Sequence, residues 1–208
     1  MTRRVALTVD LDPVDAYHRI HGLAPAAAQW RHHLSRVAIP RFLALFERLG
    51  ARATFFVVGQ DLDDGPVRDC LAEAVAAGHE LANHTETHPY DFLDGDPQSR
   101  ADEIQRCHER LAALTGARPV GFRAPGYHAD APLLRALVKR GYRYDSSLLP
   151  SAPYWLAKAG VMAALRLRGR PSRARLHAPT DLLAPRGPYA ASTDHPWRRG
   201  AGLVAEIP

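Results

Sequence analysis

The segment Gly78-His79-Glu80-Leu81-Ala82-Asn83-His84-Thr85-Glu86-Thr87-His88-Pro89-Tyr90 joins an apolar run to two histidines four residues apart. The run around Leu81 predicts a buried strand, and the histidines follow at its end. Residues at i and i+4 lie on one side of a helical turn, so His84 and His88 are within reach of one metal ion. Pro89 prevents that turn from continuing as a straight helix. In a chain with 11 histidines, an ordinary surface or core pair is the alternative, and a third ligand is needed to decide.

The start of the chain supplies two carboxylates that, like the two histidines, follow a predicted strand. The run Arg4-Val5-Ala6-Leu7-Thr8-Val9 predicts a buried strand, and Asp10-Leu11-Asp12-Pro13 follows it. Since alternate residues of a strand point to the same face, Asp10 and Asp12 can face one site. Two carboxylates that close an apolar strand are costly to bury unless they bind a cation or take separate roles. One carboxylate with His84 and His88 makes a ligand set that leaves positions open for water; a solvated strand end is the alternative.

Strands and helices alternate along the rest of the chain. Further strands are expected at 53–59, 79–83, 120–123 and 142–147, and helices at 34–49, 64–78, 99–115 and 131–140. This alternation predicts right-handed crossovers and a parallel sheet. Polar groups at successive strand ends predict a barrel-like closure with one active face. Residues 14–33 are rich in His, Pro and Gly and are expected to form a long loop beside the site. His18 and His21 are expected to be surface or loop-packing residues, and contact with substrate is the alternative.

Two of the later strand ends also carry polar side chains. Arg123 ends one strand and is followed by Ala124-Pro125-Gly126-Tyr127. Its guanidinium is suited to holding a carboxylate through a bidentate pair. Asp145 lies near the end of the next strand. Both side chains are therefore expected at the same edge of the sheet as Asp10 and His84.

Length, composition and charge narrow the class of protein. The 208 residues are expected to form one domain, 1–208. The formal charge of +5 is carried almost entirely by arginine, and no nucleic-acid-binding motif accompanies it, so no nucleic-acid partner is expected. No apolar segment is long enough to cross a membrane and no secretory signal is seen, so a cytoplasmic location is expected. Cys70 and Cys107 are expected to be free, buried thiols.

The motifs together resemble those of a known family. Thr8-Val9-Asp10-Leu11-Asp12, His84-Thr85-Glu86-Thr87-His88, Arg123-Ala124-Pro125-Gly126-Tyr127 and Tyr144-Asp145-Ser146 stand in the order found in the polysaccharide deacetylases, the chitooligosaccharide deacetylase homology domain of carbohydrate esterase family 4. Ala53-Thr54-Phe55-Phe56-Val57 and the segment 78–84 add to the resemblance, which covers residues 4–150 well. It implies a distorted (β/α) barrel, a divalent metal that is usually zinc, and hydrolysis of an N-acetyl group from an amino sugar.

The resemblance also implies a role for each motif residue. Asp12, His84 and His88 are expected to hold the metal, and Asp10 to act as the general base. Arg123 is expected to orient Asp10 and keep it ionised. The backbone N–H of Tyr127, in the turn with Pro125 and Gly126, is expected to bind the oxyanion. Asp145 resembles the acid that orients a histidine acting as general acid to the leaving amine.

The sequence departs from the family pattern in two places. Leu11 separates the two aspartates, which are adjacent in the commoner pattern. The last family motif, an apolar residue and a histidine on a late strand, is not found, because the chain stops at Leu203-Val204-Ala205-Glu206-Ile207-Pro208, which itself reads as the beginning of a strand. We therefore expect a distorted barrel that lacks its last C-terminal elements. The alternative is that His128, His177 or His195 replaces the missing histidine.

Two further segments are expected to have structural roles only. On the helix at 99–115, Glu103, Arg106, Glu109 and Arg110 form a charged face that solvation alone explains. Residues 151–167 form an apolar, helical stretch followed by several arginines. That stretch is expected to cover the barrel, and contact with an anionic membrane surface is the alternative. Residues 181–199 are expected to be loop.

The sequence thus predicts a metal-dependent hydrolase that removes N-acetyl groups from an amino-sugar glycan or saccharide through metal-activated water. One divalent ion, most simply zinc, is its expected cofactor, and an N-acetylated saccharide its partner. Hydrolysis of another small amide, such as a formamido sugar or a cyclic ureide, is a near alternative. A non-catalytic, metal-binding carbohydrate module is an alternative of a different class.

Overall fold

The computed structural model describes residues 5–169, 172, 174–176 and 178–208. Its strands form one sheet in the order β1-β2-β3-β4-β5-β7-β6. Neighbours from β1 to β7 in this order are parallel, and β6 is antiparallel to β7. The strands are β1 (Thr8–Leu11), β2 (Thr54–Val57), β3 (Glu80–Asn83), β4 (Gly121–Phe122), β5 (Tyr144–Asp145), β6 (Tyr189–Ala190) and β7 (Ala205–Glu206).

The α/β class with parallel strands is therefore confirmed. In the part of the chain that the structure describes, the sheet is not closed, and β1 and β6 are its two edges. The distorted, incomplete barrel expected from the sequence thus takes the form of an open sheet. The strand expected at the C-terminal end is present as β7. The expected loop at 181–199 is wrong in part, because it contains β6 and the end of a 3₁₀ helix, η3 (Pro179–Leu183).

In the described ranges, seven α-helices connect and cover the strands. They are α1 (Val14–Ile20), α2 (Ala28–Arg31), α3 (His33–Leu49), α4 (Gly65–Ala76), α5 (Pro97–Thr115), α6 (Ala131–Lys139) and α7 (Ala152–Leu167), with 3₁₀ helices η1 (Gly59–Asp63) and η2 (Phe92–Asp94). Asp64 begins α4 by accepting a hydrogen bond from the Val67 N–H, and Pro66 fits the first turn. Gly50 ends α3 in the left-handed conformation at φ 60°, where a Cβ would be strained.

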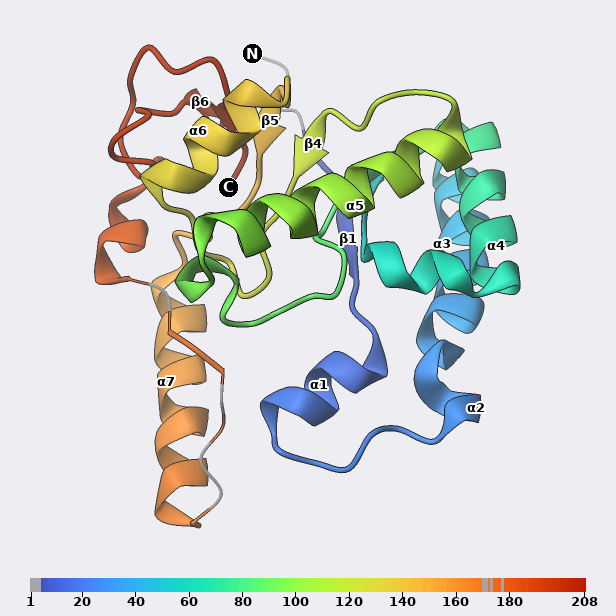
Figure 1. The fold of residues 1–208 in the computed structure, drawn as a ribbon, viewed down its shortest axis with the longest axis horizontal. Coiled ribbons are helices and arrows are strands. Elements are labelled where there is room, and N and C mark those ends of the chain that lie inside the picture. The colour runs from blue at the N-terminus through green and yellow to red at the C-terminus, as the bar shows by residue number, and fades with distance from the viewer. Residues whose placement is uncertain (1–4, 170–171, 173, 177) are drawn as a thin grey trace.

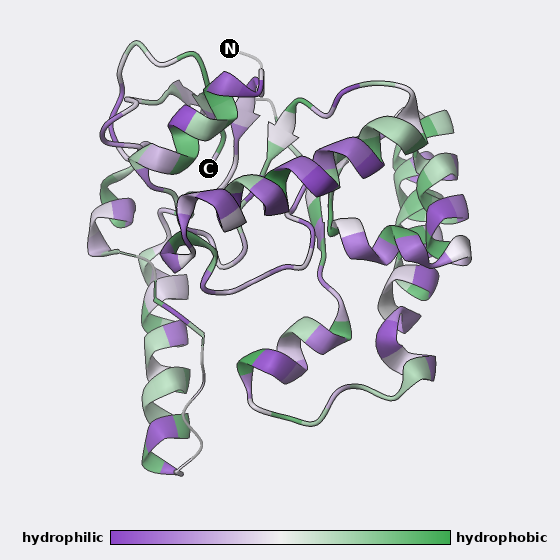
Figure 2. Ribbon diagram, in the orientation of Figure 1, coloured by the Kyte–Doolittle hydropathy of each residue, from purple (hydrophilic) through white to green (hydrophobic). Residues whose placement is uncertain are grey.

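The hydrophobic core consists of two clusters, which pack against different strands of the sheet. One packs α3 and α4 against β1–β3 around Ile39, Phe55 and Leu71. The other packs α6 against β4 around Phe122 and Leu137. In Figure 1, α5 crosses in front of the sheet between the α3–α4 side and the α6 side, and much of its outward face is hydrophilic in Figure 2. Both clusters hold the short strands rigidly, so the residues that follow the strands have fixed positions.

Three sequence expectations about outer segments need correction. Residues 14–33 do not form a simple loop, because α1 and α2 lie within them. Of the two thiols, Cys107 is buried as expected, whereas Cys70 is only half-buried, and both are free. The helix expected at 151–167 is α7, but it buries no residue and leaves Leu156, Val161 and Leu167 exposed. It extends away from the rest of the fold in Figure 1 and does not cover the sheet.

None of the described helices combines the length and apolar character needed to cross a bilayer.

Candidate active site

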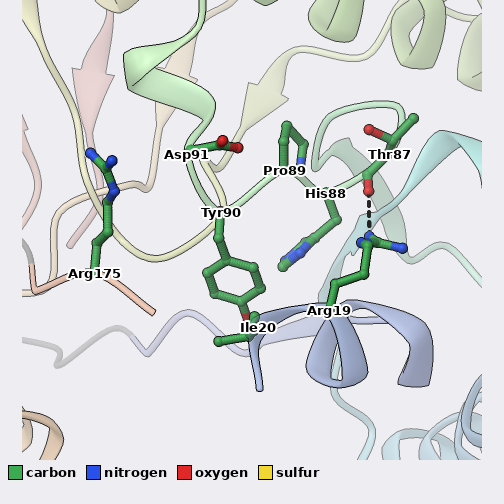
Figure 3. A pocket seen from close by; sticks show the side chains of 8 residues that line it. All are labelled: Arg19, Ile20, Thr87, His88, Pro89, Tyr90, Asp91 and Arg175. Carbon is green, nitrogen blue, oxygen red and sulfur yellow. Dashed lines mark hydrogen bonds between the residues drawn. The ribbon is translucent and has the colours of Figure 1, made fainter. Parts of the chain in front are cut away.

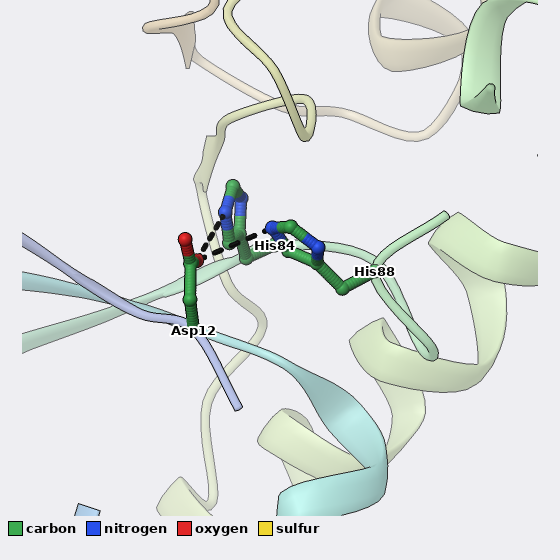
Figure 4. Close-up of side chains that lie close together, drawn as sticks. All are labelled: Asp12, His84 and His88. Atoms are coloured by element: carbon green, nitrogen blue, oxygen red, sulfur yellow. Dashed lines mark ion pairs between the residues drawn. The ribbon is translucent and has the colours of Figure 1, made fainter. Parts of the chain in front are cut away.

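Asp12, His84 and His88 lie together beyond the carboxyl ends of β1 and β3 (Figure 4). Asp12 Oδ1 is 3.3 Å from His84 Nε2 and 3.2 Å from His88 Nε2. Ligands that share a tetrahedral ion at about 2.0–2.2 Å are separated by roughly these distances. The expected metal ligands are thus brought together by the fold, with both imidazoles buried.

The hydrogen bonds of this cluster fit a metal ion. Asp12 Oδ1 is buried and has no hydrogen-bond donor among the described residues. His84 Nδ1 is 2.7 Å from the carbonyl oxygen of Arg123, to which it donates. That bond fixes the tautomer and leaves the Nε2 lone pair free for an ion. Burial lowers the pKa of His88, which favours the neutral ligand form. Burial also acts to raise the pKa of Asp12, but the two adjacent imidazoles outweigh it and hold this pKa well below its usual value.

The segment that carries the two histidines is not helical, so the expected helical turn is wrong. Thr85 and His88 both have positive φ, at 68° and 56°. Such residues are uncommon and cost free energy unless the surroundings hold them. The Thr85 N–H donates to Asn83 Oδ1 (2.8 Å), and the His88 N–H donates to Thr85 Oγ1 (3.1 Å). A strained loop held by its own polar side chains therefore sets the geometry of the histidines.

Glu103 of α5 supports the same loop. Its carboxylate accepts hydrogen bonds from the backbone N–H and from Oγ1 of Thr87, each at 2.8 Å. Arg110, about two helical turns further on, donates to Glu86 at 2.9 Å. The charged face of α5 is therefore not explained by solvation alone, which corrects the sequence interpretation. Its function is to anchor the loop between His84 and His88.

We expect Glu103→Ala to weaken both the fold and the metal site. The partly buried Thr87 N–H loses its acceptor, which is expected to cost about 1 kcal/mol, the lower end of the range for a buried donor. Loosening the loop is expected to lower metal affinity about tenfold or more. Urea denaturation and zinc titration measure the two effects. Glu109→Ala on the exposed side of α5 is the matched control, and equal behaviour of the two variants contradicts the anchoring role.

Asp10 lies beside the cluster and is held by two residues of the β4 loop. Arg123 Nη1 donates to Asp10 Oδ1 and the Tyr127 hydroxyl donates to Asp10 Oδ2, both at 2.6 Å. The expected bidentate pair is wrong, because the other guanidinium nitrogens donate to the backbone oxygen and hydroxyl of Ser146. The guanidinium also stacks 4.0 Å from the centre of the Phe56 ring. These contacts fix the guanidinium, and through it the Asp10 carboxylate.

The turn after Arg123 adopts a conformation that sequence patterns do not reveal. Gly126 and Tyr127 both have positive φ, at 82° and 61°. The Tyr127 N–H is 3.4 Å from the Ala124 oxygen, a long contact that leaves this N–H weakly engaged. Pro125 precedes this pair in the turn, and Ser147 Oγ accepts the Ala124 N–H at 2.8 Å. The contact of the Tyr127 hydroxyl with Asp10 was not anticipated from the sequence.

Asp145 is fully buried and meets another carboxyl group. It accepts a hydrogen bond from Ser147 Oγ and is paired in the strand register with Glu206 of β7. Burial raises the pKa of both groups, and the charge of Asp145 raises that of Glu206 further, which favours protonation of the pair. Within the described ranges, no histidine is bonded to Asp145. The predicted role of Asp145 therefore lacks its histidine partner here.

The metal-ligand cluster opens into a cavity of about 610 Å³ that Asp10 also lines. Its walls include four tyrosines, Tyr17, Tyr90, Tyr127 and Tyr154, together with His21 and Lys158. A second cavity of about 720 Å³ adjoins it on the other side of His88 and Tyr90, where Arg19 donates to the Thr87 oxygen (Figure 3). Mixed aromatic and polar walls of this size suit a ligand larger than a single small ion.

Sequence reasoning missed Tyr17. Its hydroxyl donates to Asp12 Oδ2 at 3.1 Å, so α1 contributes directly to the site. The missed signal is the four-residue spacing of Ala16 and Ile20, which form the buried face of α1. This spacing indicates a helix directly after Asp12, and Tyr17 lies on that helix. Of the candidate replacement histidines, His128 contacts Asp181, His195 lies in an exposed segment beside Trp197, and His177 lies outside the described residues.

A buried carboxylate near the site provides a pH-dependent prediction. Asp61 of η1 is 2% exposed, neither of its oxygens has a hydrogen-bond partner among the described residues, and His32 Nδ1 lies 3.4 Å from its Oδ1. Burial, and then the charges of Asp64 and Asp12, raise its pKa to about 7. The folded chain therefore binds more protons than the unfolded chain between about pH 4 and about pH 7, so stability falls as the pH rises through this range.

We expect Asp61→Asn to be more stable than the parent chain by about 1–3 kcal/mol at about pH 8, and by much less at about pH 5. The amide cannot ionise, so it does not carry the cost of a buried charge. Urea denaturation at the two pH values measures the difference, with the exposed Asp63→Asn as control. The same difference at both pH values contradicts the assignment.

Comparison with known proteins extends these observations. The family profile described as polysaccharide deacetylase matches residues 2–144. Over 157 residues the chain is 32% identical to the peptidoglycan deacetylase-like protein FGM2 of Gibberella zeae, covering 70% of this chain and 44% of that protein. It is 29% identical over 156 residues to the peptidoglycan deacetylase of Helicobacter pylori, covering 73% and 52%. The chain thus spans about half the length of these curated relatives.

A solved structure shares the fold over nearly the whole chain. It is a candidate polysaccharide deacetylase from Mycobacterium smegmatis, superposed with a TM-score of 0.64 at 20% identity. The superposition covers 97% of this chain and 56% of the other. The arrangement of strands described above is therefore the arrangement found in that protein.

Proposed function

The chain belongs to the polysaccharide deacetylase family, and from this premise we propose that it hydrolyses the N-acetyl group of an amino sugar in a glycan or saccharide, with a bound divalent metal ion. The observation that carries the proposal is the cluster of Asp12, His84 and His88 beside Asp10 at one end of a shared cavity. A set of ligands next to a separate carboxylate is what metal-assisted hydrolysis requires.

In this proposal Asp12, His84 and His88 hold the ion, and zinc is the ion that best suits two imidazoles and one carboxylate. When bound, such an ion supplies Lewis-acid activation of water and of the amide carbonyl. His84 is held for this role by its hydrogen bond to the Arg123 oxygen. Glu103 serves it indirectly, because it fixes the loop on which His88 lies.

Asp10 is the proposed general base. It has no contact within the ligand cluster, and its oxygens accept hydrogen bonds from Arg123 and Tyr127, which leaves each oxygen with a further lone pair. The carboxylate takes a proton from water as the water attacks the acetyl carbon. Arg123 keeps the carboxylate in place, and the weakly engaged Tyr127 N–H, in the turn with Pro125 and Gly126, is the proposed donor to the oxyanion.

The test is acetate release from N-acetylglucosamine oligomers by the zinc-reconstituted chain. Acetate release that requires zinc supports the proposal. Formamido sugars and cyclic ureides in the same assay distinguish hydrolysis of another amide, since release of formate or ring opening without acetate release favours that alternative. Binding of the oligomers with zinc present and no hydrolysis of any amide favours a non-catalytic carbohydrate module.

A further inference from the structure

Helix α7 carries apolar side chains on the outside of the molecule. It contains no buried residue, and Leu156, Val161 and Leu167 are 65, 58 and 89% exposed. Much of the helix is hydrophobic in Figure 2, where it extends away from the sheet. An apolar helix face normally packs against a protein core. Since soluble proteins rarely leave a continuous apolar surface in water, the outer side of α7 indicates a binding surface.

The exposed side of α7 is continuous and almost free of charge. Apart from Arg166, its exposed positions from 156 to 167 are small or apolar, and we call them the α7 face: Leu156, Ala157, Gly160, Val161, Ala163, Ala164 and Leu167. Spacings of three and four residues place Leu156, Gly160, Ala163 and Leu167 in one line along the helix. The α7 face therefore extends over about three helical turns.

Positive charge is gathered at the C-terminal end of α7. Arginine stands at positions 166, 168, 170, 173 and 175, and no Asp or Glu occurs between Asp145 and Asp181. Arg166 and Arg168 are exposed, and among the described residues neither guanidinium has a carboxylate partner. Arg175 differs, because it forms an ion pair with Asp94. An apolar helix next to unpaired arginines is complementary to a lipid surface that is negatively charged at its boundary and apolar beneath it.

The same charges disfavour a second copy of this chain on the α7 face. In a parallel pair of α7 helices, Arg166 and Arg168 of the two copies would repel each other. In an antiparallel pair they would meet a helix that has no carboxylate. A bilayer that contains anionic lipid supplies both an apolar layer and negative headgroups, and arginine side chains reach such headgroups while their stems stay in the apolar layer.

The other end of α7 lies at the candidate active site. Tyr154 and Lys158 line the cavity that also contains Asp10 and the metal-ligand cluster. The ring centre of Tyr154 is 6.2 Å from that of Tyr127. A surface that binds the α7 face is therefore brought beside the opening of this cavity.

We propose that α7 docks the protein on an anionic lipid surface, with Leu156, Val161 and Leu167 among the acyl chains and the arginines at the headgroups. With 16 residues, α7 is shorter than the roughly 20 that a membrane-crossing helix needs, so it lies along the surface. Docking in this way holds the cavity at the bilayer surface. It uses no residue of the ligand cluster and does not depend on the reaction proposed above.

Flotation of the purified chain with lipid vesicles tests the proposal. One kind of vesicle contains equal parts of phosphatidylglycerol and phosphatidylcholine, and the other contains phosphatidylcholine alone. We expect binding to the first kind, weakening as the salt concentration rises, because salt screens exposed charges. Binding to the second kind is expected to be about tenfold or more weaker, since each arginine near an anionic surface strengthens binding about fivefold.

Two variants separate the apolar and the charged contributions. Substitution of all three large apolar residues of the α7 face by glutamine leaves the charge unchanged and is expected to weaken binding about 100-fold or more; the variant is Leu156→Gln, Val161→Gln, Leu167→Gln. Its matched control replaces three exposed leucines outside α7 and is expected to bind as the parent chain does; it is Leu49→Gln, Leu183→Gln, Leu203→Gln.

The charge variant Arg166→Gln, Arg168→Gln is expected to bind phosphatidylglycerol vesicles about tenfold or more weakly than the parent chain. Arg41→Gln, Arg48→Gln, on the exposed surface of α3, has the same net charge as this variant and is expected to stay close to the parent. Circular dichroism and thermal unfolding show whether each variant is folded. Equal binding by the two arginine variants overturns the role of the α7 arginines and, with it, the proposal.

The parent chain alone can also contradict the proposal. Absence of flotation with phosphatidylglycerol vesicles, or equal flotation with both kinds of vesicle, overturns docking on an anionic surface. Equal loss in the α7-face variant and its leucine control overturns the assignment to α7. Self-association in sedimentation without flotation assigns the α7 face to a second copy. Since none of these readouts uses acetate release, failure of the docking and failure of the proposed reaction are distinguishable.

Discussion

The double variant His84→Ala, His88→Ala is expected to retain no stoichiometric zinc, whereas the parent chain binds about one ion. The two imidazoles are two of the three side chains that converge in the cluster, and their Nε2 atoms lie 3.3 and 3.2 Å from Asp12 Oδ1. A single remaining carboxylate does not hold a zinc ion against dialysis. Elemental analysis of purified, dialysed protein measures the effect directly.

Loss of the ion is expected to lower amide hydrolysis by about 10³-fold or more, because Lewis-acid stabilisation contributes several kcal/mol and each 1.36 kcal/mol is tenfold in rate. The matched control is His33→Ala, His195→Ala, which removes two exposed histidines and is expected to retain both zinc and activity. Zinc bound at full stoichiometry by the His84→Ala, His88→Ala variant places the ion elsewhere and contradicts the ligand assignment.

Asp10→Asn is expected to lower kcat by about 10²–10⁴ while zinc content stays at the parent level. The substitution keeps the size of the side chain and an oxygen that accepts from Arg123 or Tyr127, but an amide does not take a proton from water. Since Asp12 and not Asp10 lies between the two histidines, the ion is retained. Acetate release and elemental analysis on the same sample separate the two effects.

Asp69→Asn, on the exposed surface of α4, is the control for the change of charge. Loss of zinc from the Asp10→Asn variant reverses the division of roles between Asp10 and Asp12. Parent-level kcat with zinc retained removes Asp10 from the chemistry and leaves the general base to be found among the other polar groups of the cavity.

Several parts of the site follow from local sequence. The strand that ends in Asp10 and Asp12 and the strand that precedes His84 are visible as apolar runs. Parallel pairing of β1, β2 and β3 brings their ends to one edge of the sheet, so the cluster follows from the alternation of strands and helices alone. The beginning of α4 at Asp64 and the end of α3 at Gly50 also follow, because capping depends on residues within one turn.

Other parts were decided only by tertiary structure. The loop between His84 and His88 takes positive φ values instead of a helical turn, because Glu103, 16 residues after Thr87, supplies acceptors that a local pattern does not contain. Asp145 is paired with Glu206 on a different strand, β7, about 60 residues away in the sequence. Local propensity and capping are encoded by neighbours in sequence, whereas a hydrogen bond between distant segments forms only after packing fixes both partners. The sequence by itself therefore determined the sheet and the residues at its edge, and the tertiary structure decided which partner each polar side chain has.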